Sequence, residues 1–160
     1  MEPEIQDFIA MVRAGGEVGD AVLEENVRNA ESLAVAHQGA CLVAVAALKK
    51  PKASYRTNIH AKSKVAVDAG AFPFELGYVF VLPSARYGGI GLTLCNTALS
   101  PAGSKGVFAT ARTDNDGIRA ILAKLGFSKA GKPYESTRGD YQLQLSLRPA
   151  AHQLVSGDVP

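Results

Sequence analysis

This sequence of 160 residues contains few cysteines and histidines and has a small net charge. It has two cysteines, three histidines and a formal net charge of +2. Cys41 and Cys95 both lie in apolar runs, so we expect small buried side chains rather than a disulfide or a nucleophile. His37, His60 and His152 are isolated from other ligand-type residues, which gives no metal site at a recognisable spacing. The small charge does not require nucleic acid or a membrane as a partner.

Long hydrophobic segments are also missing. No apolar run reaches the roughly 18 residues that a membrane span needs. Residues 1–5 lack the basic and apolar regions of a secretory signal peptide. There is no internal repeat, and the length suits one buried core. We therefore expect a cytoplasmic protein without a membrane partner.

The pattern of apolar residues predicts two helices and two strands in the first part of the chain. Ile5, Phe8, Ile9 and Val12 recur at helical spacing. Asp20 can cap the second helix, and a continuous apolar run is typical of a central strand. The predicted elements are helices over residues 5–15 and 20–30, a strand over 32–36, a turn at 38–39 and a strand over 41–48.

Strands and helices then alternate through the rest of the chain. The predicted elements are strands over residues 75–82, 107–111, 129–136 and 141–147, and helices over 91–99 and 115–126. Asp114 or Asn115 can cap the last helix, and Gly126 can end it. This order predicts a single α/β domain with a mixed sheet over residues 1–148, followed by a flexible tail over 149–160.

A glycine-rich loop, residues 86–91, lies between a predicted strand and a predicted helix. Backbone N–H groups and the helix dipole favour an anion at such a place, and phosphate is the first one to expect. Plain turn chemistry explains three glycines equally well when the loop is considered alone. The loop lacks the Lys-Ser or Lys-Thr of a P-loop, because Leu92-Thr93 follow Gly91. A dinucleotide fingerprint is disfavoured by Leu94, where a glycine or alanine is needed.

Three short motifs resemble the GNAT superfamily of N-acetyltransferases. Val81-Leu82-Pro83 followed by Arg86-Tyr87-Gly88-Gly89-Ile90-Gly91 is similar to the acetyl-CoA loop of that family. Asn115 and Lys124-Leu125-Gly126-Phe127 stand where many members have the same residues. The resemblance implies a mixed, mostly antiparallel sheet flanked by helices. It also implies transfer of an acetyl group from acetyl-CoA to a primary amine, without a metal.

The resemblance also implies which residues bind the co-substrate. The backbone amides of Tyr87, Gly88, Gly89, Ile90, Gly91 and Leu92, with Arg86, would hold the pyrophosphate of coenzyme A. Main-chain groups near Val79 and Val81 would pair with the pantetheine arm, and Asn115 would hydrogen-bond the same arm. Simple N-capping is an equally common role for an asparagine at this place.

Glu75 is the candidate general base, because a catalytic glutamate lies at this distance before the loop in the better-known members. A base is needed, since deprotonating a lysine-like amine at pH 7 costs about 5 kcal/mol. The alternative is a solvated glutamate at a strand start. Leu122 stands where many members have the tyrosine that protonates the departing sulfur. Tyr134 or a water is the substitute acid, unless Tyr134 only packs.

The departure at Leu122 keeps open a second function, that of a non-catalytic acyl-CoA sensor or interaction module. Residues 49–64 add a basic stretch without an acidic residue. It is interpreted as a solvated loop or helix face, as a contact for the 3′-phosphate of coenzyme A, or as an attractant for an anionic acceptor. Nucleic acid is disfavoured, because this stretch has no series of aromatic residues interleaved with the basic ones. A homodimer stays open as the assembly state.

Overall fold

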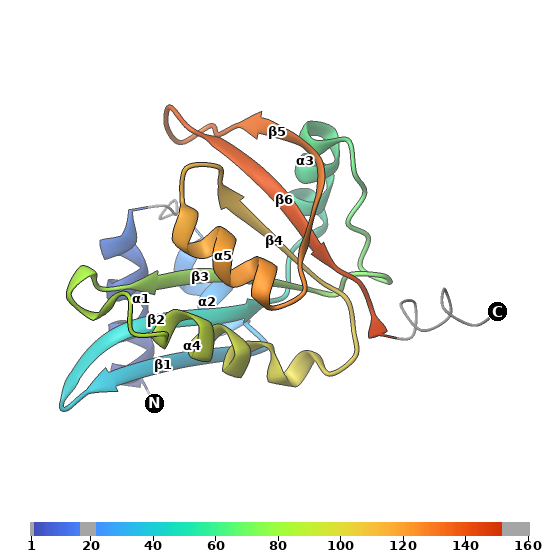
Figure 1. The fold of residues 1–160 in the computed structure, drawn as a ribbon. Helices are drawn as coiled ribbons and strands as arrows, with labels where there is room; N and C mark the ends of the chain where they lie inside the picture. The colour runs from blue at the N-terminus through green and yellow to red at the C-terminus, as the bar shows by residue number, and fades with distance from the viewer. Residues whose placement is uncertain (1, 17–21, 152–160) are drawn as a thin grey trace. The chain divides into compact units, whose positions relative to one another are not determined.

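A computed structural model describes residues 2–16 and 22–151 of the chain. Figure 1 shows its helices and strands. In chain order they are α1 (Glu2–Gly15), α2 (Leu23–Arg28), β1 (Ser32–Gln38), β2 (Cys41–Lys49), α3 (Ala53–Ser63), β3 (Phe74–Val81), the 3-10 turn η1 (Pro83–Ala85), α4 (Ile90–Leu99), the 3-10 turn η2 (Ser100–Ala102), β4 (Val107–Arg112), α5 (Asp116–Lys124), β5 (Ser128–Glu135) and β6 (Gln142–Arg148). No helix among the described residues is long and apolar enough to cross a membrane.

The strands hydrogen-bond in the order β1-β2-β3-β4-β6-β5. The β1–β2, β4–β6 and β5–β6 pairs are antiparallel, whereas β3 pairs with β4 in parallel through Phe74↔Val107 and Glu75↔Phe108. The predicted fold class, a mixed and mostly antiparallel sheet with flanking helices, is therefore confirmed. The chain forms two compact units that divide within β3. The N-terminal unit is Met1–Lys50 with Leu76–Pro101, and the C-terminal unit is Pro51–Glu75 with Ala102–Pro160.

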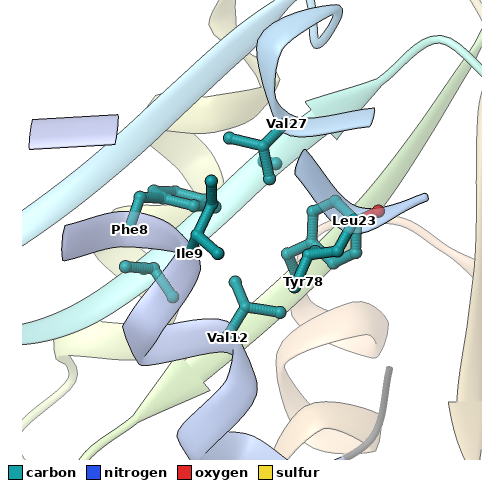
Figure 2. Close-up of a cluster of buried hydrophobic side chains, with 8 residues drawn as sticks. Phe8, Ile9, Val12, Leu23, Val27 and Tyr78 are labelled. Atoms are coloured by element: carbon teal, nitrogen blue, oxygen red, sulfur yellow. The ribbon is translucent and has the colours of Figure 1, made fainter. Parts of the chain in front are cut away.

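The core of the N-terminal unit explains the continuous apolar run of β2. Helices α1 and α2 pack on β2, and α4 packs on β1 and β2. Figure 2 shows side chains from α1, α2 and β3 meeting in one cluster. Its buried members are Phe8, Ile9, Val12, Leu23, Val27, Val45, Ala47 and Tyr78. Because helices cover both faces of the strand, β2 has no polar alternation.

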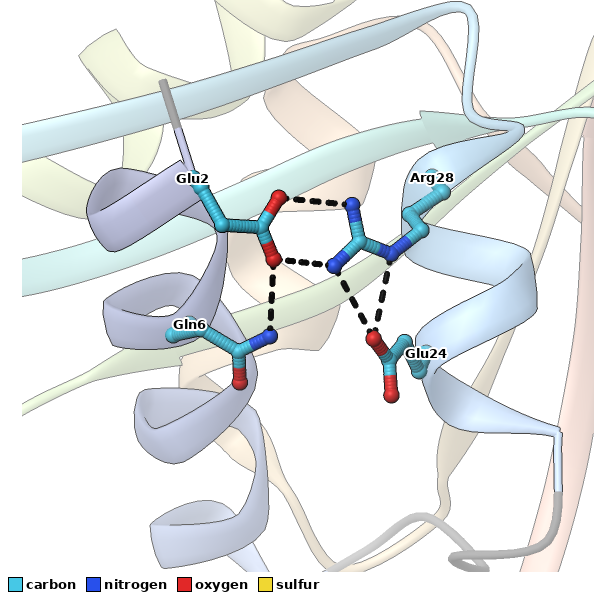
Figure 3. A network of polar contacts seen from close by, with 4 residues as sticks. All are labelled: Glu2, Gln6, Glu24 and Arg28. Carbon is cyan, nitrogen blue, oxygen red and sulfur yellow. Dashed lines mark hydrogen bonds and ion pairs between the residues drawn. The ribbon is translucent and has the colours of Figure 1, made fainter.

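A polar network at the surface joins α1 to α2 (Figure 3). Arg28 makes a bidentate ion pair with Glu2, and its Nε and Nη2 atoms also donate to Glu24. Gln6 donates to Glu2 over 3.1 Å. The hydrogen bonds from Arg28 and Gln6 lower the pKa of Glu2 to about 2.

Replacing Arg28 tests this network through pH. A carboxyl whose pKa is lowered on folding stabilises the protein above its unfolded pKa of 4.5, and that stabilisation is lost as the pH falls towards 2. We expect Arg28→Met to lower the melting temperature slightly at pH 7 and to flatten its decline between these pH values. Thermal denaturation of both proteins across this range measures the effect. An unchanged acid dependence in the variant would contradict the assignment.

The C-terminal unit has its own core, in which α3 packs on β5. Ile59, Val67, Phe108 and Leu145 form the buried cluster. Arg56 fastens α3 to the segment before β3. Its guanidinium donates to the carbonyl oxygens of residues 67, 72 and 73 over 2.7, 2.7 and 3.1 Å. Arg56 therefore does not belong to the predicted solvated face of the basic stretch, because its guanidinium binds backbone carbonyl groups. Other residues of the stretch, such as His60, are exposed as predicted.

The structure differs from the sequence prediction at one of the two cysteines. Cys41 is exposed at the start of β2, because it follows the hairpin turn, whereas Cys95 is buried as expected; both are free thiols. Residues 53–63, whose structure the sequence left open, form α3. Gln144 and Ser146 on β6 are buried. Gln144 meets the cost of burial by donating to the carbonyl oxygens of Ala130 and Leu145.

Some predictions fall outside the described residues. These are the capping role of Asp20, the isolation of His152 and most of the expected flexible tail. The structure gives Val22 as the N-cap residue of α2. The domain bounds at residue 148 stay a prediction.

Candidate functional site

The glycine-rich loop leads into α4, and Gly89 is the N-cap residue of this helix. Gly89 has a φ of 80°, in the left-handed region that glycine adopts without strain. Gly89 has no side chain that could cap the helix, and the first backbone bond after Gly89 runs from Thr93 N to Gly89 O. The amides of Ile90, Gly91 and Leu92 therefore have no carbonyl partner within the helix.

The space around the loop also suits an anion. A Cβ atom added at Gly88 or Gly89 would meet nothing within 4 Å. Residues 82–92 contain no acidic side chain that could occupy the amides or repel a phosphate. The predicted anion loop thus has open amides, a helix N-terminus and no negative charge of its own. These properties fit a pyrophosphate.

Two side chains of the loop have unusual positions. Tyr87 is fully exposed, with a φ of 71° that a residue with a Cβ rarely adopts. Arg86 turns back onto β3, where its Nε donates to Val81 O over 2.9 Å and its guanidinium lies 5.8 Å from the Phe80 ring centroid. This bond fixes the start of the loop against the end of the strand.

The strand before the loop is irregular at Tyr78. The φ of Tyr78 is 53°, which interrupts the extended geometry of β3. Lys49 covers this place, with its Nζ 4.3 Å from the Tyr78 ring centroid and its stem against Gly77. The nearby main chain at Val79 and Val81, predicted to pair with pantetheine, follows directly after the irregularity. This irregularity is not predictable from the sequence, because tyrosine is not a usual residue at positive φ.

Asn115 is the N-cap residue of α5. Its Oδ1 accepts a hydrogen bond from Ile118 N over 3.1 Å. The capping role that the sequence left open is therefore confirmed. Contact with the pantetheine arm stays a prediction, and it would use the amide nitrogen of Asn115.

Glu75 lies in a polar cluster inside the C-terminal unit. It is only 2% exposed, and Tyr55 on α3 donates to its Oε2 over 2.7 Å. Burial, followed by the charge of Glu75, raises the pKa of Tyr55 well above its ordinary value, while a hydrogen bond with Thr110 lowers it. The alternative of a solvated glutamate is therefore wrong. The part of Tyr55 in this cluster was not predicted from the sequence, because Tyr55 lies in the basic stretch, whose only evident feature is its charge.

Tyr134 on β5 belongs to the same cluster. Burial and then the charge of Glu75 raise the pKa of the Tyr134 phenol to about 12. Tyr134 stays protonated at neutral pH and is partly exposed, whereas Glu75 is covered. The structure therefore brings the two predicted catalytic side chains into one electrostatic neighbourhood. Leu122, at the place of the usual tyrosine acid, is buried in α5.

Removing the Tyr55 hydroxyl tests the strength of this cluster. We expect Tyr55→Phe to lower the free energy of unfolding by about 1–3 kcal/mol, because a buried carboxylate loses a hydrogen-bond donor. Chemical denaturation measures the loss. Tyr141→Phe is the matched control, since it removes the same group but keeps the ring that stacks on Arg112 at 4.1 Å. Equal losses in the two variants would contradict the role of the Tyr55 bond.

The described residues contain no cluster of metal-ligating side chains, either at the glycine-rich loop or around Glu75. Within residues 2–16 and 22–151, no three side chains of His, Cys, Asp or Glu lie together in a way that could hold a metal ion.

Comparisons with known proteins bear on the fold. No family model matches the sequence, and no curated protein matches it. The ribosomal-protein-alanine N-acetyltransferase of Brucella melitensis matches in structure with a TM-score of 0.64, at 20% identity over 93% of this chain and 96% of its own. Arabidopsis thaliana NAA60, solved with a bisubstrate analogue, has a TM-score of 0.61 at 13% identity over 91% of each chain.

A third solved structure includes the expected co-substrate. Salmonella typhimurium yncA, solved with its cofactor acetyl-CoA, matches with a TM-score of 0.51 at 15% identity. The match covers 71% of this chain and 61% of that protein. At these identities the likenesses show the fold.

Proposed function

We propose that this chain, which has the fold of the GNAT N-acetyltransferases, transfers an acetyl group from acetyl-CoA to a primary amine. The observation that carries the proposal is the loop before α4. Its glycine N-cap, its open amides and its lack of acidic side chains suit the pyrophosphate of coenzyme A. The structural similarity to yncA, which was solved with acetyl-CoA, supports acetyl-CoA as the ligand of this chain.

The loop and the strand before it bind different parts of coenzyme A in this proposal. In the proposal, the amides of residues 87–92 hold the pyrophosphate, and the bond from Arg86 to Val81 O keeps the loop in place. Main-chain groups of Val79 and Val81 pair with the pantetheine arm as an added strand would. Acetyl-CoA supplies a thioester whose carbonyl carbon is open to attack by an amine.

The reaction needs one proton removed and one supplied. The amine nitrogen attacks the thioester carbonyl carbon, the C–S bond breaks, and the nitrogen loses a proton. The sulfur leaves as a thiolate and takes up a proton from Tyr134 or from a water molecule. Because a thiol has an ordinary pKa of about 8.5, the thiolate leaves without a strong acid, which makes Leu122 compatible with turnover.

Glu75 is the proposed final acceptor of the amine proton. Since its side chain is 2% exposed, an acceptor molecule does not reach it directly. Tyr134 lies within its electrostatic influence and is partly exposed, so Tyr134 or a water beside it relays the proton. Tyr55 holds the carboxylate in one position through the 2.7 Å bond.

A second function is favoured by two observations. Leu122 replaces the usual acid, and Glu75 is covered by the fold. Both suit a non-catalytic acyl-CoA sensor or interaction module. Thiol release from acetyl-CoA, measured with a panel of primary amines, separates the two functions. An enzyme releases thiol in an amine-dependent way, whereas a sensor binds acetyl-CoA and releases none with any amine.

A further inference from the structure

A shallow cavity opens on the surface of the C-terminal unit beside Tyr134. Its volume is about 350 Å³. The lining residues come from the end of α3, from β5 and from the start of β6: Lys62, Lys132, Pro133, Tyr134, Glu135 and Gln142. A cavity of this size admits a small molecule.

The backbone fixes the two lysines at this cavity. Strand β5 has a register shift between Ala130 and Tyr134, and Lys132 lies within it. Next to it, Gly131 has a φ of 69°, and a Cβ there would collide with the carbonyl oxygen of Ser63 at the end of α3. Only glycine allows this approach, which holds Lys132 at the same cavity as Lys62.

The lining has an excess of positive charge. Of the described residues, none forms an ion pair with Lys62 or Lys132. Glu135 is the only acidic lining residue, and its Oε1 accepts a hydrogen bond from Gln142 Nε2 over 3.3 Å. Two like charges held at one cavity repel each other, and an anion between them relieves that repulsion.

Tyr134 connects this cavity with the buried cluster. Tyr134 is one of the lining residues, and the charge of Glu75 acts on its phenol. A molecule in the cavity thus lies beside the residue proposed to relay protons to Glu75. The lysines would bind one end of that molecule, and Tyr134 would face another.

We propose that this cavity is the acceptor subsite and that the acceptor carries a carboxylate or phosphate, bound by Lys62 and Lys132, on the same molecule as the reacting amine. The claim that the bound molecule carries the reacting amine rests on the proposed function. The claim that the cavity binds an anion rests on Lys62 and Lys132 alone. It gives a role to part of the basic stretch that α3 carries.

Nuclear magnetic resonance titration tests the anion site without turnover. The full chain, labelled with ¹⁵N, is titrated with N-acetylglycine, with its neutral amide and with inorganic phosphate. We expect amide shifts confined to residues near 62 and 131–135. The double variant Lys62→Met/Lys132→Met should bind N-acetylglycine about tenfold more weakly, because it loses both charge-assisted hydrogen bonds. Lys124→Met/Lys129→Met removes the same charge elsewhere in the unit and should bind as the wild type does.

Each outcome decides the proposal. Preference for the anionic probe over the amide, lost only in the first double variant, supports it. Equal response to both probes, equal loss in the two double variants, or no response near residues 131–135 overturns it. Response to phosphate but not to N-acetylglycine assigns the anion as a phosphate. Stabilisation by acetyl-CoA is measured in the same samples, so that a failure of the proposed function is seen separately from a failure of the anion site.

Discussion

We expect Gly89→Glu to abolish the stabilisation of the protein by acetyl-CoA. The substitution places a Cβ at a φ of 80° and a negative charge at the N-cap of α4, where the pyrophosphate is proposed to bind. At a ligand concentration of 100 Kd the wild type gains about 2.7 kcal/mol, which is roughly 5 to 10 °C in melting temperature for a chain of this size. The variant should gain nothing measurable. Differential scanning fluorimetry with and without acetyl-CoA measures the difference.

Gly103→Glu is the matched control for this variant. Gly103 has a φ of 56° and open space for a Cβ, so the same side chain meets the same kind of backbone cost. Both variants should lose about 1 kcal/mol or more of unfolding free energy from a residue with a Cβ in the left-handed region. Only Gly89→Glu should lose the response to acetyl-CoA. If Gly103→Glu loses it as well, strain rather than the loop explains the effect.

We expect Glu75→Gln to slow amine-dependent thiol release by about 10²- to 10⁴-fold, the usual contribution of a positioned base. The glutamine amide has the same size as the glutamate carboxyl group. In the wild type the Tyr55 hydroxyl donates to Glu75 over 2.7 Å, and the amide oxygen of the variant can accept the same hydrogen bond. Binding of acetyl-CoA should therefore stay within about twofold of the wild type, since the loop before α4 is untouched. Steady-state kinetics and a binding isotherm for acetyl-CoA measure the two effects separately.

Glu31→Gln serves as the control for the same chemical change. Glu31 pairs with Lys50 at 3.8 Å on the surface of the N-terminal unit and has no proposed part in the reaction. Its turnover should equal that of the wild type. Unchanged turnover in Glu75→Gln would remove Glu75 from the mechanism and favour the sensor function.

Most of the secondary structure was predictable because its signals are local. The apolar spacing of α1, the continuous apolar run of β2 and the cap at Asn115 depend on neighbours in the sequence. Helix α3 was not predictable in this way. It buries little more than Ile59 and Ser63, and it is held by the bonds from Arg56 to distant carbonyl groups.

The loop of the candidate site was predictable, whereas the environment of Glu75 was not. Residues 86–91 carry their own signal in the glycines, and the structure gives Gly89 the backbone angle that this signal requires. Glu75 accepts a hydrogen bond from Tyr55, which lies 20 residues earlier in the chain. Contacts over such a separation leave no periodic pattern.

Binding of acetyl-CoA is tested most directly by the melting temperature of the wild-type protein with acetyl-CoA, ATP and NAD. We expect clear stabilisation by acetyl-CoA and much less by ATP or NAD at the same concentration, because the loop lacks the lysine of a P-loop and the third glycine of a dinucleotide fingerprint. No stabilisation by acetyl-CoA at millimolar concentration would contradict both the enzyme and the sensor.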